Sequence, residues 1–376
     1  MNLLLQGLLN DLLEKCNHLI QEVRTLDNLP VEVKNYQTSI LETLSKIESD
    51  IKIIQSDPSI GSTAFTKNYL RKYKRLAERL YLLEWGPVLA LSRFSERDTF
   101  STRVCKMIAE EINYPYAPPL CVTLSSNHYF TYPHTNIIMI PVIEPSHLLG
   151  LPDLYHEMGH NILFRENMMA IFLTEINNYY NVQIEQAKRD SKPKKYIEFL
   201  RNSLLMWRSQ WSLEFASDLI ATYLVGPAYA WANIRLCINL SHDIFASDPE
   251  KYHSHPSDDA RNEGVCSMLE KIGVSSEKIA KIRGLWNQFI DMAGQSKPQD
   301  YELKFPPVLI GKLRDYIYDQ CLKINLMPYT KQKTNPDKIN ITLILNKAWE
   351  EFNSSPAAFS TWEATQITAI KSLFNF

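Results

Sequence analysis

Apolar residues recur at alternating intervals of four and three positions through the first 56 residues of the chain. This spacing is typical of the apolar seam of a coiled coil. It runs over 5–26, stops at the polar turn 27–30 and resumes over 40–54. We therefore expect residues 1–56 to form a coiled-coil-like helical hairpin. Its two seams either pack against each other or leave an apolar face free to dock a protein partner.

Residues 57–119 continue with helical periodicity after a loop at 57–61. We expect helices over 63–85 and 87–112, of which the first has a basic face. A basic run of this kind is usually a solvated surface. A nucleic-acid-binding surface needs an excess of positive charge, whereas the whole chain has a formal net charge of −2. We therefore expect no nucleic-acid partner.

The pattern changes after a proline-rich turn at 113–119. Segments 120–124 and 136–142 are short, apolar and bounded by turn residues, which predicts two strands with a hairpin or loop between them. Helical periodicity then returns and continues to the C-terminus, where residues 271–376 show no chemistry-bearing motif. The sequence therefore predicts a mainly α-helical protein with a small β-sheet, an α+β fold.

One predicted helix, 152–164, carries the clearest chemical signal. Its sequence PDLYHEMGHNILF contains H-E-x-x-H, formed by His156, Glu157 and His160, which is the zincin signature. Residues four apart lie on one face of a helix, so the two imidazoles can bind one Zn²⁺. Glu157 is placed to take a proton from a zinc-activated water without binding the metal. The alternative is a chance match on a buried helix.

A catalytic zinc site needs a third protein ligand, and Glu214 is the best candidate. Glu214 and Asp218 lie four residues apart in a segment that is apolar almost all round, so both should be buried. Two buried carboxylates are costly unless they meet a cation. We expect Glu214 to bind zinc and Asp218 to accept the N–H of a ligand histidine; a buried ion pair with Arg or Lys is the alternative. Glu166 and Glu175 lie in less apolar surroundings and rank lower as ligands.

The combination of H-E-x-x-H and E-x-x-x-D resembles the gluzincin arrangement of zinc peptidases. The separation between His160 and Glu214 is longer than in thermolysin-like enzymes and is similar to that of the CAAX-prenyl-protease and HtpX type. The segment HPSDDAR at 255–261 resembles the H-P-x-x-x-x-R element of the same group. The resemblance covers about 120–265, and the chain departs from the group because nothing in it looks long enough to span a membrane.

This resemblance implies roles for further side chains. His255 would stabilise the oxyanion, and Arg261 would anchor the site or the substrate, although plain loop residues would look the same. A tyrosine would assist at the scissile carbonyl. Among Tyr223, Tyr229 and Tyr252 we favour Tyr252, because it is close to His255 in the sequence.

The resemblance also implies a strand for the substrate. In zincins an edge strand that precedes the motif helix pairs with the extended substrate backbone. Ile138, Met139 and Ile140 are placed for this role, although an interior strand would have the same pattern. The zincin-like core would then cover 120–270, with helical regions at 1–56, 57–119 and 271–376.

Together these features predict a zinc metallopeptidase that acts on peptide or protein substrates. Two other classes fit: a zinc amidase for a small or cell-wall substrate, and a zincin-fold binding or regulatory protein without turnover. The six cysteines are scattered without C-x-x-C pairs, which predicts reduced thiols and a cytoplasmic location. No stretch approaches the roughly twenty uninterrupted apolar residues of a membrane span.

Overall fold

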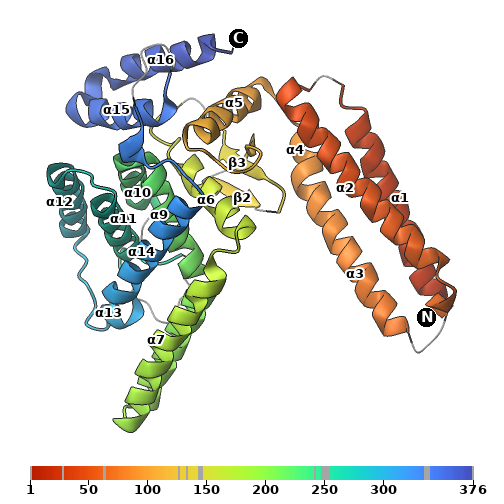
Figure 1. Ribbon diagram of the computed structural model, residues 1–376, viewed down its shortest axis with the longest axis horizontal. Helices are drawn as coiled ribbons and strands as arrows, with labels where there is room; N and C mark the ends of the chain where they lie inside the picture. Colours follow the sequence, from red (N-terminus) through yellow and green to blue (C-terminus); the bar gives the residue numbers. More distant parts are fainter. Residues whose placement is uncertain are drawn as a thin grey trace.

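The computed structural model describes residues 2–27, 29–61, 65–125, 128–132, 134–142, 147–240, 243–246, 255–333 and 339–374. These residues form a mostly helical fold with one three-stranded sheet (Figure 1), as the sequence pattern predicts. Among them, no helix is both long and apolar enough to cross a membrane.

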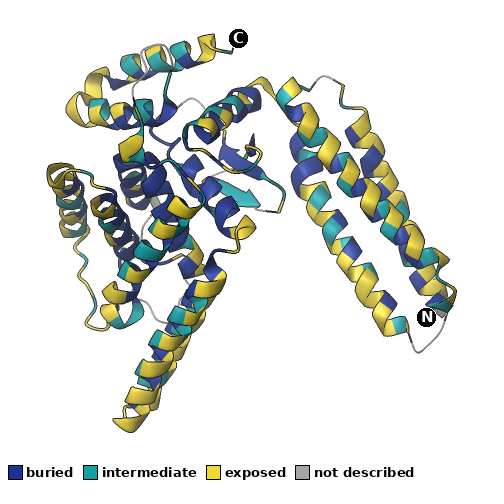
Figure 2. Cartoon of the chain, viewed as in Figure 1, coloured by how far each residue is buried: buried dark blue, intermediate teal, exposed yellow. Residues whose placement is uncertain are grey.

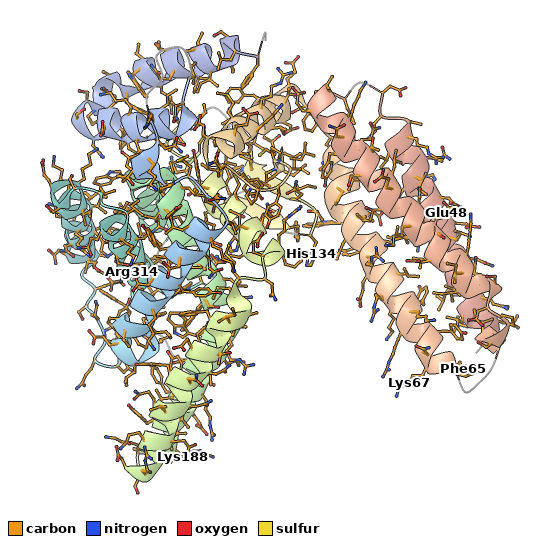
Figure 3. All side chains as sticks on the ribbon, in the orientation of Figure 1. Glu48, Phe65, Lys67, His134, Lys188 and Arg314 are labelled. Carbon is orange, nitrogen blue, oxygen red and sulfur yellow. The ribbon has the colours of Figure 1, made fainter. Side chains whose placement is uncertain are left out.

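The N-terminal hairpin is confirmed and gains a third helix. Helices α1 (Asn2–Arg24), α2 (Val31–Ser56) and α3 (Thr66–Leu83) pack together as an arm set to one side of the molecule (Figure 1). The two seams face each other, and their residues are buried except Leu26, which is partly buried. Phe65 and Lys67 mark the far end of this arm (Figure 3). A docking role for its outer face stays a prediction.

The connection from the arm to the rest of the chain is irregular. The expected single helix over 87–112 is interrupted: a π-helical turn (Glu84–Val88) leads into the short α4 (Leu89–Ser92), and α5 (Glu96–Glu111) follows after a break. Pro87 lies inside the π-helical turn. Because proline has no N–H and its ring crowds the preceding turn, a regular helix cannot continue through it.

The sheet contains β1 (Leu120–Ser125), β2 (Phe130–Tyr132) and β3 (Ile137–Pro141) in the order β1-β3-β2. Strand β3 runs parallel to β1 and antiparallel to β2. The prediction that Ile138, Met139 and Ile140 form an edge strand is therefore wrong, because β3 is paired on both sides. The short strand β2, which the sequence pattern left as a hairpin or loop, forms one edge.

Strand β3 is buried throughout because it separates two hydrophobic cores. Ile138 and Ile140 pack into the larger core, whereas Ile137 and Met139 pack into the core shared with the arm. Helix α5 and the C-terminal helices belong to the larger core, and α3 belongs to the arm. The packing thus divides the chain after α4, inside the region expected at 57–119.

The predicted motif helix is α6 (Asp153–Arg165), and most of its residues are buried (Figure 2). The helices that follow it along the chain form the larger core together with it. They are α7 (Met169–Arg189), α8 (Lys194–Met206), α9 (Ser212–Val225), α10 (Pro227–Leu240), α11 (Asp258–Lys271), α12 (Ser276–Ala293), α13 (Tyr301–Lys304), α14 (Pro307–Lys323), α15 (Ile341–Ser354) and α16 (Pro356–Ser372). Helix α7 projects away from this body, with Lys188 near its tip (Figure 3).

Helices α6 and α9 pack against each other more closely than ordinary side chains allow. A Cβ atom built on Gly159 would lie 3.2 Å from the Cα atom of Ser217 and 3.3 Å from its carbonyl oxygen. Glycine in a helix interior costs about 1 kcal/mol relative to alanine. Here it lets the backbone of α9 approach the motif helix between its two histidines.

Candidate metal centre

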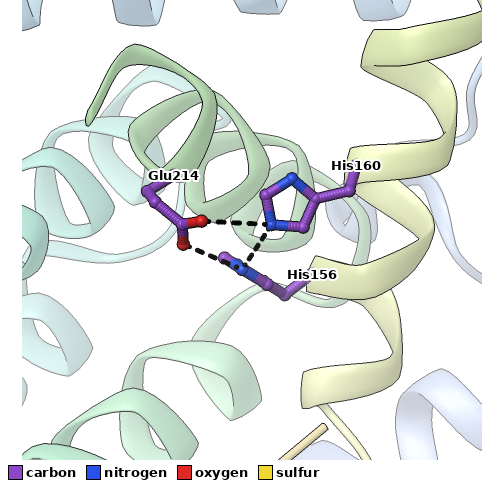
Figure 4. A group of neighbouring side chains, drawn as sticks. All are labelled: His156, His160 and Glu214. Carbon is purple, nitrogen blue, oxygen red and sulfur yellow. Dashed lines mark hydrogen bonds and ion pairs between the residues drawn. The ribbon is translucent and has the colours of Figure 1, made fainter. Parts of the chain in front are cut away.

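Two helices bring His156, His160 and Glu214 together (Figure 4). The Nε2 atoms of His156 and His160 are 3.1 Å apart. The Glu214 carboxylate reaches both of them, with Oε2 at 3.5 Å from His156 Nε2 and Oε1 at 3.6 Å from His160 Nε2. The predicted ligands on the two helices therefore lie next to one another, although 54 residues separate His160 from Glu214 in the sequence.

The spacing of these atoms fits a zinc ion. Tetrahedral zinc with bonds of about 2.0–2.2 Å to imidazole nitrogen and carboxylate oxygen separates its ligand atoms by roughly 3.3–3.6 Å. The three observed separations fall in or just below this range. Two imidazoles and one carboxylate are also a ligand set that zinc takes in catalytic sites with an open fourth position.

The surrounding fold positions both elements. The motif helix is held by Tyr155, whose hydroxyl bonds that of Thr342 at 2.9 Å. Glu214 lies in the first turn of α9, directly after a π-helical turn (Trp207–Trp211). The indole N–H of Trp207 in that turn donates to the carbonyl of Lys304 at 2.9 Å. Such wide turns often occur at functional sites, because they shift the register of the residues that follow.

The three side chains of the cluster shift one another's pKa values strongly. Burial lowers the pKa of His156, but its hydrogen bonds to Asp218 and Glu214 outweigh this effect and raise that pKa to about 10. Burial, with the neighbouring His156, lowers the pKa of His160 to about 4. Burial would raise the pKa of Glu214, but the two histidines lower it to about 2. Metal-free, the cluster therefore keeps a proton on His156, and a divalent ion that binds both imidazoles displaces it.

Asp218 lies behind His156, where its predicted role requires it. Its Oδ1 atom is 2.9 Å from His156 Nδ1, so His156 turns Nε2 towards Glu214. Arg261 donates to the same carboxylate twice, from Nε to Oδ2 at 2.7 Å and from Nη2 to Oδ1 at 2.8 Å. All of these groups are buried. Arg261 therefore anchors the site through Asp218.

Tyr229 completes this arrangement. Its hydroxyl donates to Asp218 Oδ1 and lies 3.0 Å from His156 Nδ1. Of the other two candidate tyrosines, Tyr223 donates to the carbonyl of Leu326, away from the site. Tyr252, the favoured one, lies outside the described residues. Among described residues, Tyr229 is thus the candidate tyrosine that contacts the metal-site side chains.

A cavity of about 300 Å³ opens beside these side chains. Glu157 lines it together with His156 and Glu214, and its carboxylate accepts the backbone N–H of Thr131 in β2. Burial raises the pKa of Glu157 to about 8. His255 also lines the cavity, with its Nε2 atom 3.6 Å from Glu214 Oε2 and its side chain 59% exposed.

The weaker ligand candidates do not reach the cluster. Glu166 ends the motif helix and accepts a hydrogen bond from Tyr116. Glu175 pairs with Lys312 on the surface, at 3.0 Å. Neither carboxylate belongs to the group of side chains that could hold a metal ion.

Sequence reasoning missed part of the cavity wall. His128 and Tyr129, which directly precede β2, line it together with Asp153 and Asp258. Asp153 lies in the first turn of the motif helix and Asp258 within HPSDDAR, and neither position by itself indicates a place in the cavity wall. The sequence could not assign these two aspartates to a cavity, because aspartate is common at a helix N-terminus for structural reasons alone.

No protein-family model, no curated protein and no solved structure matches this chain. The assignment of a function therefore depends on the geometry of the site and on the motif.

Proposed function

We propose that this chain is a zinc-dependent metallopeptidase in which His156, His160 and Glu214 hold the ion. The observation that carries the proposal is the convergence of the two H-E-x-x-H imidazoles and a carboxylate from a second helix to within 3.1–3.6 Å of one another. A zinc ion held there polarises a carbonyl group and lowers the pKa of a bound water to about 7.

Glu157 is the general base in this proposal. It borders the same cavity as His156 and Glu214 without belonging to the ligand group. Its carboxylate takes the proton from the attacking water and donates it to the amine that leaves. His255, at the same cavity, donates a hydrogen bond to the carbonyl oxygen as negative charge develops on it. Arg261 acts from behind, by holding Asp218 and through it His156.

A peptide fits the site better than a small amide because a strand edge borders it. Strand β2 pairs with β3 on one side, and no other described strand pairs with it. The Thr131 N–H of β2 points to Glu157, so this edge lies beside the reacting groups. An extended peptide can add to such an edge through its backbone.

A cytoplasmic location fits the six cysteines, which are all buried and unpaired.

The substitution Glu157→Gln tests the mechanism. It removes the base but keeps the size of the side chain, so zinc content stays at the wild-type level while hydrolysis of a peptide library falls by at least about a hundredfold, the lower range for a general base. Glu166→Gln is the matched control, because it makes the same change on the same helix outside the cavity and leaves both readouts unchanged. Hydrolysis that survives in Glu157→Gln contradicts the proposal.

A further inference from the structure

The described side chains of the cavity beside the metal residues include more acidic than basic groups. Four carboxylates among them line it, those of Asp153, Glu157, Glu214 and Asp258. The guanidinium that lines it within the described part of the chain, that of Arg261, is already bound by Asp218 from behind. With a divalent ion bound, three positive charges would face four carboxylates of the described residues, Asp218 included and Glu157 left out because its pKa is raised. The cavity therefore attracts a cation beyond the metal.

Asp258 is one of the four carboxylates in this wall, and it forms no ion pair with a described Lys or Arg. It occupies the first position of α11, but the cap of that helix is the neighbouring Ser257, whose hydroxyl accepts the N–H of Ala260. Its contact is the thiol of Cys237, which donates to it. Among the described residues, no Lys or Arg side chain forms an ion pair with Asp258.

The next residue shows what a structural aspartate looks like in this fold. Asp259 turns into the protein, where it accepts the indole N–H of Trp286 at 3.0 Å and pairs with Lys297 at 3.0 Å. Asp258, one position earlier, faces the cavity and lacks such partners. Asp259 therefore has a structural role inside the protein, whereas Asp258 places its carboxylate in the wall of the cavity.

The cavity also has an apolar part near Asp258. Leu236 and Cys237 of α10 line the cavity, and Cys237 contacts Asp258. Long basic side chains combine an apolar stem with a charged end. Leu236 can contact the stem while Asp258 meets the charge. A volume of about 300 Å³ is at the lower limit of ligand pockets, so it suits one such side chain beside the scissile amide.

We propose that this cavity binds the Lys or Arg side chain of the residue next to the scissile bond, with Asp258 as its counter-ion. The inference rests on the proposed peptidase function and adds a substrate class to it: peptides with a basic residue at the cleavage site. Asp258 determines specificity and takes no part in the chemical step. Its removal changes which substrate binds, because the ammonium or guanidinium group loses a charge-assisted hydrogen bond in a partly enclosed site.

Two hydroxamates test the proposal without any turnover. Nα-acetyl-lysine hydroxamate and Nα-acetyl-norleucine hydroxamate both bind zinc through the same group and differ by one ammonium. Calorimetry on the zinc-loaded full chain should show the lysine compound binding about tenfold to a hundredfold more tightly, the range of one hydrogen bond to a charged group. Asp258→Asn removes this ratio and Asp258→Lys inverts it. Asp258→Glu, which keeps the charge, retains it.

The matched control is Glu263→Gln, which removes the same charge from the same helix at an exposed position paired with Arg283. It leaves the affinity ratio unchanged. Equal affinities for the two hydroxamates in the wild type overturn the inference, as does a ratio that survives in Asp258→Asn. These outcomes are separate from a failure of the proposed function. A zinc-loaded chain that binds the hydroxamates with the expected ratio but cleaves no peptide contradicts the peptidase alone, and one that binds neither contradicts both.

Discussion

The N-terminal arm and the metal centre show two different ways of building a buried interior. The arm is held by apolar seams, and its core residues on α1 and α2, such as Leu9, Leu44 and Ile47, have no exposed surface. The metal centre buries His156, Asp218 and Arg261 at comparable depth. Dispersion and the hydrophobic effect act without direction, whereas each buried polar group needs a partner in a defined geometry.

This difference teaches where substitutions are tolerated. An apolar seam accepts other apolar residues of similar volume. In the metal centre, the Asp218 carboxylate contacts the side chains of Arg261, Tyr229 and His156. Removing one of these groups leaves the others with a buried charge or hydrogen-bonding atom that lacks a partner. We therefore expect substitutions in the arm to lower stability without changing zinc affinity, and substitutions in the metal centre to lower both.

Arg261→Met should have the largest effect. It leaves the buried Asp218 carboxylate without its cation, which costs about 3–5 kcal/mol, and it weakens zinc binding because Asp218 no longer holds His156. Urea denaturation and zinc analysis measure the two effects. Arg283→Met is the control, since this guanidinium pairs with Glu270 at the surface and should cost less than about 1 kcal/mol. Equal losses in both variants would contradict the role given to the buried Arg261–Asp218 pair.

Leu44→Ala should come next. Leu44 lies in the seam between α1 and α2 and is fully buried, so the cavity left behind costs about 2–5 kcal/mol. Because the arm contributes no side chain to the metal cavity among the described residues, zinc affinity should not change. Chelator competition on the folded variant measures this affinity. A parallel loss of zinc would show that the arm and the centre are coupled.

Tyr229→Phe should give the smallest and most specific effect. It removes the hydroxyl that contacts Asp218 and His156, and residues in this position typically change metal affinity by about tenfold to a hundredfold. Tyr223→Phe removes an equally buried hydroxyl that donates to the Leu326 carbonyl, away from the metal side chains, so it should change stability without changing zinc affinity. The ratio of the two zinc dissociation constants decides whether Tyr229 positions the ligand histidine.

The parts of this fold that follow from local periodicity could be predicted. The seams of the arm and the motif helix depend on the spacing of neighbouring residues, and the apolar surroundings of Glu214 indicated that it needs a cation. The pairing of Arg261 with Asp218 spans 43 residues, and no spacing rule connects them. The resemblance pointed to Arg261 but left its partner open.

The strands show a second limit. Strand β2 has three residues, and only its pairing with β3 makes it a strand. Strand β3 is apolar on both faces because it separates two cores, a pattern that an edge strand covered by substrate could also show. Edge and centre are properties of the pairing, so the sequence of β3 alone could not distinguish them.

The zinc content of the purified chain tests the central claim most directly. After dialysis against metal-free buffer, elemental analysis should find about one zinc ion per wild-type chain and none in His156→Ala or Glu214→Ala, each of which removes one of the three converging ligands. A folded wild-type chain that retains no zinc and takes up none on titration would contradict the account.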